Sequence, residues 1–199
     1  AALDAKQADK ERIATEKKAA KEAATAERQA AKEAATQEKL AAMTPEQKAR
    51  LKIDNMLKDA GWDIVDRMHY NPTVSAVAIE EGLLKGNLEA DYFLFINGKA
   101  VGVLEAKREE VNISSNMVSE QTITYAKSVP DCYQVWQRPL PFLYKSNGKE
   151  IEFFDYRYRE TSEWETINRI HTPKEIVKML GIEDPFAGLP TLNEKGLRK

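Results

Sequence analysis

Three side chains with complementary chemistry lie within one stretch of the chain: Asp91, Glu105 and Lys107. Glu105 and Lys107 continue the apolar run 101–104, and a carboxylate and an ammonium buried at a strand end each need a partner. Magnesium takes oxygen ligands, which Asp91, Glu105 and a backbone carbonyl near Ala106 can supply. A magnesium-bound water could then attack a phosphodiester while Lys107, on the same side of the strand as Glu105, holds that water or balances the phosphate charge. These residues predict a metal-dependent phosphodiester hydrolysis centre.

The Glu-Ala-Lys tripeptide is weak evidence by itself, because Asp4-Ala5-Lys6 matches the same pattern inside a solvated helix. Three features distinguish Glu105. It ends a hydrophobic strand, an aspartate begins the paired strand, and the tight turn Asn97-Gly98 joins the two. The alternative interpretation is a salt-bridged hairpin end without a catalytic role.

The hairpin formed by residues 91–96 and 99–104 must bring the two carboxylates together. An ideal two-residue turn at Asn97-Gly98 would place Asp91 opposite Leu104 and turn Glu105 to the other face of the sheet. The catalytic hypothesis needs these carboxylates to converge. We therefore predict a three-residue loop with Gly98 left-handed, or a bulge or bend near the Asp91 end.

Both faces of this hairpin are apolar, which is typical of central strands covered by helices on both sides. Covering helices are predicted after Thr44-Pro45 as far as Gly61, over residues 115–128, and from Thr172 to Gly181. Further strands are predicted at 63–68 and 76–79, and a second hairpin at 142–145 and 151–154. The sequence thus predicts an α/β fold, with a central mixed sheet flanked by helices.

Residues 1–43 are rich in Ala, Lys and Glu and contain an eleven-residue repeat at 15–25 and 26–36. They predict a long helix preceding the core, as a solvated spacer or weak coiled coil. The domain that holds the predicted hydrolysis centre is expected at 44–182, and residues 183–199 read as a linker.

Composition excludes several classes of protein. The formal net charge is −2, whereas a stand-alone DNA-binding protein is usually basic, so other domains would have to supply much of any phosphate affinity. The single cysteine, Cys132, rules out a disulfide framework within the chain and favours a cytoplasmic setting. His69 and His171 show no metal-ligand spacing. No stretch is apolar enough to predict a membrane span.

Gln121 and Tyr125 lie four residues apart, on one face of the predicted helix behind the Glu-x-Lys motif. With them, the chain resembles the PD-(D/E)xK nuclease superfamily, in the branch that carries a Gln-xxx-Tyr motif. The closer resemblance is to the N-terminal nuclease domain of type I restriction enzyme R (restriction/motor) subunits. The segments that carry it are ADYFLFINGKAVGVLEAKR (90–108), PFLYKSNG (141–148), HTPKE (171–175) and AGW (60–62). They are spread over most of residues 46–180.

The resemblance implies a restriction-endonuclease-like core and a role for each matching residue. Asp91, Glu105 and Lys107 would be catalytic, with Asp91 and Glu105 binding Mg²⁺, and Gln121 and Tyr125 would position the DNA phosphate. A glutamate ahead of the aspartate strand often joins such sites, which points to Glu81 in preference to Glu80. Ala90 stands where the superfamily has a nominal proline, a departure common in this branch.

The resemblance also implies that double-stranded DNA is cut after ATP-driven translocation by a downstream helicase motor. The chain has no GxxxxGK[ST] loop, so ATP would act only through that absent motor. Residues 183–199 would lead toward it, and methyltransferase (modification) and specificity subunits would be partners. The alternatives are another helicase-associated PD-(D/E)xK nuclease of the repair or mobile-element type, a catalytically inactive DNA-binding scaffold, and a coiled-coil assembly module.

Overall fold

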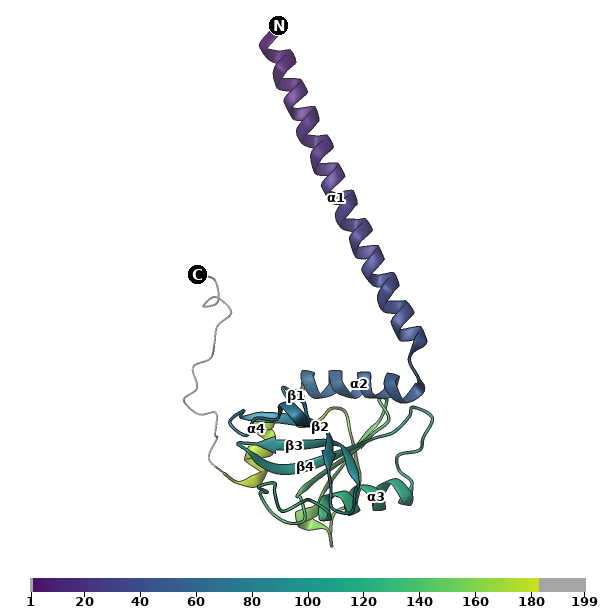
Figure 1. Cartoon of the computed structure of the whole chain (residues 1–199), viewed down its shortest axis with the longest axis vertical. Coiled ribbons are helices and arrows are strands. Elements are labelled where there is room, and N and C mark those ends of the chain that lie inside the picture. The colour runs from purple at the N-terminus through teal and green to yellow at the C-terminus, as the bar shows by residue number, and fades with distance from the viewer. Residues whose placement is uncertain (1, 183–199) are drawn as a thin grey trace. The chain divides into compact units, whose positions relative to one another are not determined.

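The computed structural model describes residues 2–182. The chain divides into two compact units, residues 1–44 and 45–199. The first unit is helix α1 (Ala2–Ala42), which contains no Gly or Pro and is labelled in Figure 1. Its side chains are exposed wherever burial is described between residues 17 and 42. The expected helix is present, while its role as a spacer or weak coiled coil stays a prediction, and the predicted linker at 183–199 lies outside the described residues.

The second unit is built on one mixed sheet, which has seven strands within the described residues, in the order β1 to β7. The strands are β1 (Asp63–Asp66), β2 (Ala76–Leu83), β3 (Glu89–Ile96), β4 (Lys99–Ala106), β5 (Phe142–Ser146), β6 (Ile151–Asp155) and β7 (Glu165–Ile167). Neighbours pair in parallel at β1–β2 and β4–β5, and antiparallel elsewhere. The 3₁₀ turns η1 (Arg67–His69) and η2 (Tyr156–Tyr158) follow β1 and β6.

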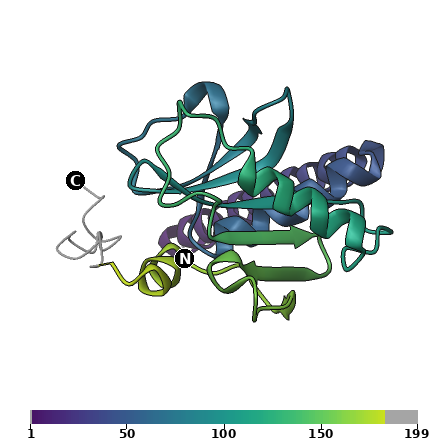
Figure 2. The same cartoon turned by 90° about the horizontal axis from the view of Figure 1, so that it is seen from below.

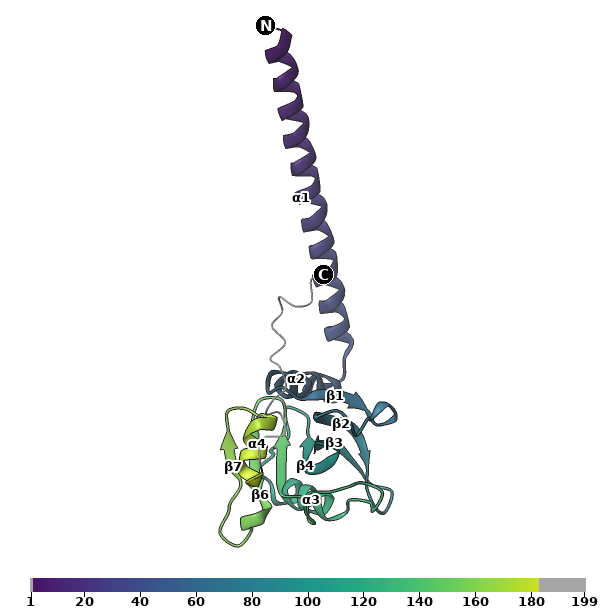
Figure 3. The ribbon, with the colours of Figure 1, turned by 90° about the vertical axis from the view of Figure 1, so that its left-hand side faces the viewer.

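Helices cover both faces of the sheet, as the apolar strands predict. Figures 1 and 3 place α2 (Pro45–Asp59) and α3 (Asn116–Lys127) on opposite sides, and Figure 2 shows α3 lying across its face. Helix α4 (Pro173–Leu180) packs into the same core as α2. That core holds Tyr92, Leu94 and Ile96, and the α3 core holds Phe93 and Phe95. The predicted α/β class with a sheet flanked by helices is confirmed.

Local sequence signals set the ends of several elements. Thr172 and Glu175 form a reciprocal capping box at the start of α4, and Gly181 ends it in a left-handed conformation. Trp62 Nε1 donates to the His171 carbonyl at 2.9 Å, which ties the end of α2 to the start of α4. Within the described residues, no helix is both long enough and apolar enough to cross a membrane.

The β3–β4 hairpin differs from the loop that we predicted. Asn97 and Gly98 both have left-handed φ angles, 48° and 74°, and form a two-residue turn that pairs Ile96 with Lys99. The expected three-residue loop is therefore wrong. The register instead shifts between Leu94 and Phe95, where β4 carries the unpaired extra residue Val101.

The bulge lies near the turn rather than near Asp91, and a second neighbour of β4 accounts for its place. Ala100 donates to the Gln134 carbonyl at 2.8 Å and accepts from Trp136 N–H at 2.9 Å. Beyond the bulge Tyr92 pairs with Leu104, so the next position sets Asp91 beside Glu105. The extra residue supplies the convergence of carboxylates that the catalytic hypothesis needs.

Candidate active site

Three acidic residues occupy adjacent positions on β2, β3 and β4. Tyr92 pairs with Glu80 on one side and with Leu104 on the other. One position further along, Asp91 lies next to Glu105 on β4 and faces Glu81 on β2, although Glu81 has a left-handed φ of 51° and is skipped in the β2–β3 register. Three carboxylates in one row repel each other unless cations or metal ions neutralise them.

Asp91 is held through both of its carboxylate oxygens. Oδ2 accepts a hydrogen bond from the Ala106 backbone N–H at 2.8 Å, which fixes the aspartate to the end of β4. Oδ1 accepts from Arg50 Nη2 at 2.5 Å, and Arg50 comes from α2. The Asp91 side chain is 18% exposed, so these two contacts define its orientation in a mostly enclosed place.

Glu105 is almost fully buried, with 2% of its surface exposed. Lys107 Nζ donates to its Oε1 at 2.5 Å. Burial, reinforced by the charge of Asp91, raises the pKa of Glu105 to about 7, although Lys107 opposes the shift. Its Oε2 is buried and has no hydrogen-bond donor among the described residues. An ionised carboxylate with such an oxygen is costly to bury unless a cation binds it.

The carboxylate oxygens of Asp91 and Glu105 fit a magnesium ion. Mg²⁺ usually keeps several waters and takes one or two carboxylates from the protein, and Asp91 with the unpartnered Oε2 of Glu105 would provide them. Among residues 2–182, no three acidic, His or Cys side chains are grouped to form a larger ligand set. The fit is therefore to a metal that is bound partly by water or substrate, not to an all-protein cage.

The two candidate glutamates on β2 have different surroundings. Glu80 pairs with Tyr92, whose hydroxyl donates to Asp54 of α2 at 2.7 Å, so it shares the α2 face of the sheet. Burial, followed by the charge of Asp54, raises the pKa of Glu80. Glu81 is the neighbour of Asp91 in the row, and its Oε1 lies 3.6 Å from Arg50 Nη1. The geometry favours Glu81 over Glu80, although its side chain is turned to Arg50.

Gln121 and Tyr125 connect α3 to the lysine. Gln121 Oε1 accepts from Lys107 Nζ at 2.9 Å, and Gln121 Nε2 donates to the Tyr125 hydroxyl at 2.7 Å. Burial raises the pKa of Tyr125, so its hydroxyl stays protonated at neutral pH. Helix α3 thus lies at the Glu105 end of the sheet, in the position that the motif led us to expect. Whether the two side chains position a phosphate stays a prediction.

Sequence analysis missed the continuation of the charged row into β5 and β6. Glu105 pairs with Lys145, and Lys145 with Glu152. Lys145 is fully buried, its Nζ lies 2.7 Å from Glu152 Oε2, and it donates to Ser119 Oγ of α3 at 2.8 Å. One sign of this was present in the sequence. Lys145 directly follows the apolar residues 142–144 in a predicted strand, so a lysine interrupts an otherwise apolar strand.

Sequence analysis also missed Arg50. The apolar positions Ala49, Ile53 and Leu57 of α2 are buried, which places Arg50 at the edge of that stripe. That edge was visible in the sequence, but the contact with Asp91 spans 41 residues and depends on where α2 packs.

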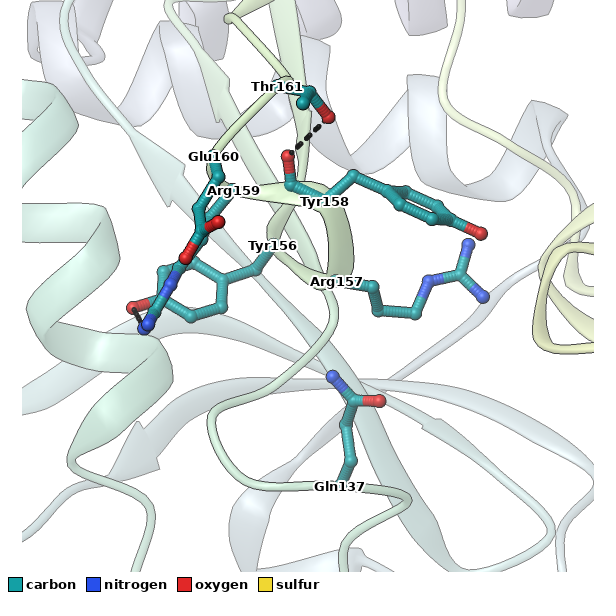
Figure 4. Close-up of a pocket in the computed structure, with 7 residues that line it drawn as sticks. All are labelled: Gln137, Tyr156, Arg157, Tyr158, Arg159, Glu160 and Thr161. Carbon is teal, nitrogen blue, oxygen red and sulfur yellow. Dashed lines mark hydrogen bonds between the residues drawn. The ribbon is translucent and has the colours of Figure 1, made fainter.

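A cavity of about 490 Å³ lies away from the carboxylate row, past the end of β6 at Asp155. Figure 4 shows it with Arg157 beside the ring of Tyr158 and Arg159 against Tyr156. The Arg157 guanidinium already donates to Asp155 and to the Met179 carbonyl. None of the residues that line this cavity belongs to the candidate active site.

Comparison with known proteins decides the family. A family model for the second domain of the endonuclease subunit of the type I restriction enzyme EcoKI matches residues 71–180, more than half of the chain. The chain belongs to this family. The resemblance to the nuclease domain of type I R subunits, inferred from the motifs, is thereby confirmed.

One curated relative of this R-subunit domain is the EcoKI endonuclease subunit of Escherichia coli (strain K12), 26% identical over 212 aligned residues. The alignment covers 77% of this chain and 18% of the relative, so the chain spans less than a fifth of that subunit. Among solved structures, a fragment assigned to an HsdR subunit of a type I restriction enzyme from Vibrio vulnificus YJ016 aligns with a TM-score of 0.48. It is 26% identical and covers 73% of this chain and 27% of the other.

Proposed function

We propose that this chain is the Mg²⁺-dependent endonuclease domain of a type I restriction R subunit and hydrolyses phosphodiester bonds in double-stranded DNA. The observation that carries the proposal is the convergence of Asp91 with a buried, donor-free oxygen of Glu105 beside Lys107. Family membership supports the restriction role.

In the proposed mechanism, bound magnesium would lower the pKa of a water and stabilise charge on the phosphate. Asp91, aligned by the Ala106 N–H, and Glu105 would hold the ion. Lys107, held between Glu105 and Gln121, would keep its ammonium directed at the attacking water or the phosphate. Gln121 and Tyr125 would position the phosphate as neutral donors, since amides and phenols are poor magnesium ligands beside carboxylates.

The wider setting is part of the same proposal. ATP-driven translocation would come from a motor outside this chain, and modification and specificity subunits would select the DNA. The chain's net charge of −2 agrees with DNA being delivered by such partners.

The test compares substitutions in the assembled enzyme. Asp91→Asn, Glu105→Gln and Lys107→Ala should each reduce cleavage of a plasmid substrate by several orders of magnitude, because each removes a part of the metal and charge machinery. ATP hydrolysis and translocation should continue. Asp63→Asn, at an exposed position on β1, is the matched control and should cleave normally. Normal cleavage by Asp91→Asn would refute the assignment.

A further inference from the structure

Arg50 is placed where a cation bound by the acidic row would lie. Its guanidinium spans two carboxylates, with Nη2 2.5 Å from Asp91 Oδ1 and Nη1 3.6 Å from Glu81 Oε1. Lys107 neutralises the third member of the row, Glu105. The protein thus supplies two cationic side chains of its own for three adjacent carboxylates.

The two contacts of Asp91 differ in how easily they can be given up. Oδ2 is bound by the Ala106 N–H, which belongs to the backbone of β4 and cannot leave without moving the strand. Oδ1 is bound by the end of a long side chain that is 36% exposed and can change rotamer. A divalent ion that approaches Asp91 therefore has Oδ1 as the oxygen available to it, and Arg50 as its competitor.

Helix α2 is fastened next to the site by contacts that do not involve Arg50. The Tyr92 hydroxyl donates to Asp54 at 2.7 Å. Arg108 pairs with Glu46 at 3.2 Å, and Lys52 with Glu109 at 2.5 Å. The backbone at Arg50 therefore stays close to the row even when its side chain turns away, and its positive charge continues to oppose a bound dication.

We infer that Arg50 is a built-in counter-cation that competes with the divalent metal for Asp91, so that metal binding displaces its guanidinium. The inference rests on the proposed metal-dependent function. Its consequence runs against simple expectation: removing a cation that contacts a metal-ligating aspartate should improve metal binding. If Arg50 instead oriented Asp91 for the metal, its removal should weaken binding.

The test measures direct binding of Mn²⁺, used alone as a spectroscopic stand-in for Mg²⁺, to the 199-residue chain by electron paramagnetic resonance of the free ion. Arg50→Gln should bind Mn²⁺ roughly ten-fold more tightly than the unsubstituted chain does. This factor corresponds to the lower end of the free energy contributed by one charge-assisted hydrogen bond. Arg50→Lys should lie between them, because lysine keeps the charge but cannot span two carboxylates.

Lys58→Gln is the matched control. It removes the same charge from the same helix, but at an exposed position in the last turn of α2, two turns beyond Arg50, so Mn²⁺ affinity should stay within about two-fold of that of the unsubstituted chain. A similar thermal midpoint for Arg50→Gln and Lys58→Gln would show that the fold is intact. Arg50→Lys keeps the comparison available if Arg50→Gln does not fold.

The two possible failures are distinguishable. Equal or weaker Mn²⁺ binding by Arg50→Gln, with binding lost in Asp91→Asn, would overturn competition by Arg50 and leave the metal site standing. Binding that Asp91→Asn does not change would overturn the metal site itself, and with it the role of Arg50.

Discussion

At the scale of single residues, Glu105 combines a stability cost with a proposed function. Its carboxylate is enclosed with one oxygen lacking a donor, next to the negative charge of Asp91. Such a group is retained at the expense of folding stability when the chemistry needs it. That cost can be measured through its dependence on pH.

The pKa of Glu105 is raised from an ordinary value of 4.5 to about 7 by burial and by Asp91. In this range the folded protein holds a proton that the unfolded chain releases. The contribution of Glu105 is therefore most favourable below about pH 4.5 and is lost as the pH rises through about 7. Glu105→Gln, which cannot ionise, should gain stability relative to the unsubstituted chain between pH 5 and pH 8.

Urea unfolding of both proteins in EDTA at the two pH values measures this difference, and titrating groups that do not interact with Glu105 cancel in the comparison. Glu105→Leu, which also lacks the charge, serves as the control for any hydrogen bonding by the amide. A difference in unfolding free energy that is the same at pH 5 and pH 8 would show that Glu105 does not titrate in this window.

At the scale of secondary-structure elements, the sequence predicted those parts that local signals determine. Asn97-Gly98 made the β3–β4 hairpin visible, and Thr172 with Gly181 marked both ends of α4. The helix predicted at 115–128 is α3 (Asn116–Lys127). Each of these signals acts over a few residues, so no knowledge of the packing was needed.

Elements that depend on distant partners were predicted less well. The strand predicted at 76–79 continues to Leu83 as β2, because Glu80, Gly82 and Leu83 pair with β3; Glu81, with a left-handed φ of 51°, is skipped in that register. β7 (Glu165–Ile167) was not predicted, and it exists through pairing with β6. The bulge at Val101 follows from a bridge between Ala100 and Val135. The candidate site residues were identified by motif, but their convergence depended on this bulge.

The buried pair Lys145–Glu152 gives a prediction at this scale, because it joins β5, β6 and, through Ser119, α3. Lys145→Met should lower the unfolding free energy by about 3–5 kcal/mol, since it leaves a buried glutamate without its cation. Lys145→Met combined with Glu152→Leu removes both charges and should recover much of the loss. Chemical denaturation of the three proteins measures this.

The control for that series is an exposed pair of the same type. Lys85 and Asp131 lie 3.0 Å apart with 52% and 82% of their side chains exposed. Lys85→Met should change stability by less than about 1 kcal/mol. A double variant of the buried pair no more stable than Lys145→Met would indicate that packing, not charge, dominates at Lys145.

At the scale of the whole molecule, the charge balance bears on how this domain meets its proposed substrate. The sequence has 30 basic and 32 acidic residues. At the candidate site, Arg50 and Lys107 are paired with carboxylates, as are Lys52 and Lys149, which both contact Glu109. Cations engaged in this way are poorly available to DNA phosphates. Under the proposed function, stable DNA binding would then come from other parts of the restriction complex.

The 199-residue chain should therefore bind duplex DNA weakly, and the binding should fall steeply with salt because it rests on a few phosphate contacts. The logarithm of the binding constant should decrease linearly with the logarithm of salt concentration, with a slope of roughly −0.9 per contacted phosphate. Fluorescence anisotropy with a labelled duplex between 50 and 200 mM salt, in Ca²⁺ to suppress cleavage, would measure both affinity and slope. Lys149→Gln weakens the cluster around Glu109 near the site, whereas Lys99→Gln changes an exposed lysine at the Asn97-Gly98 turn, the opposite end of the hairpin from Asp91 and Glu105. The two variants compare a cation near the site with one away from it. Tight binding to one sequence by this chain alone would contradict the proposed division of labour, because a domain whose cations are already paired would then be reading bases itself.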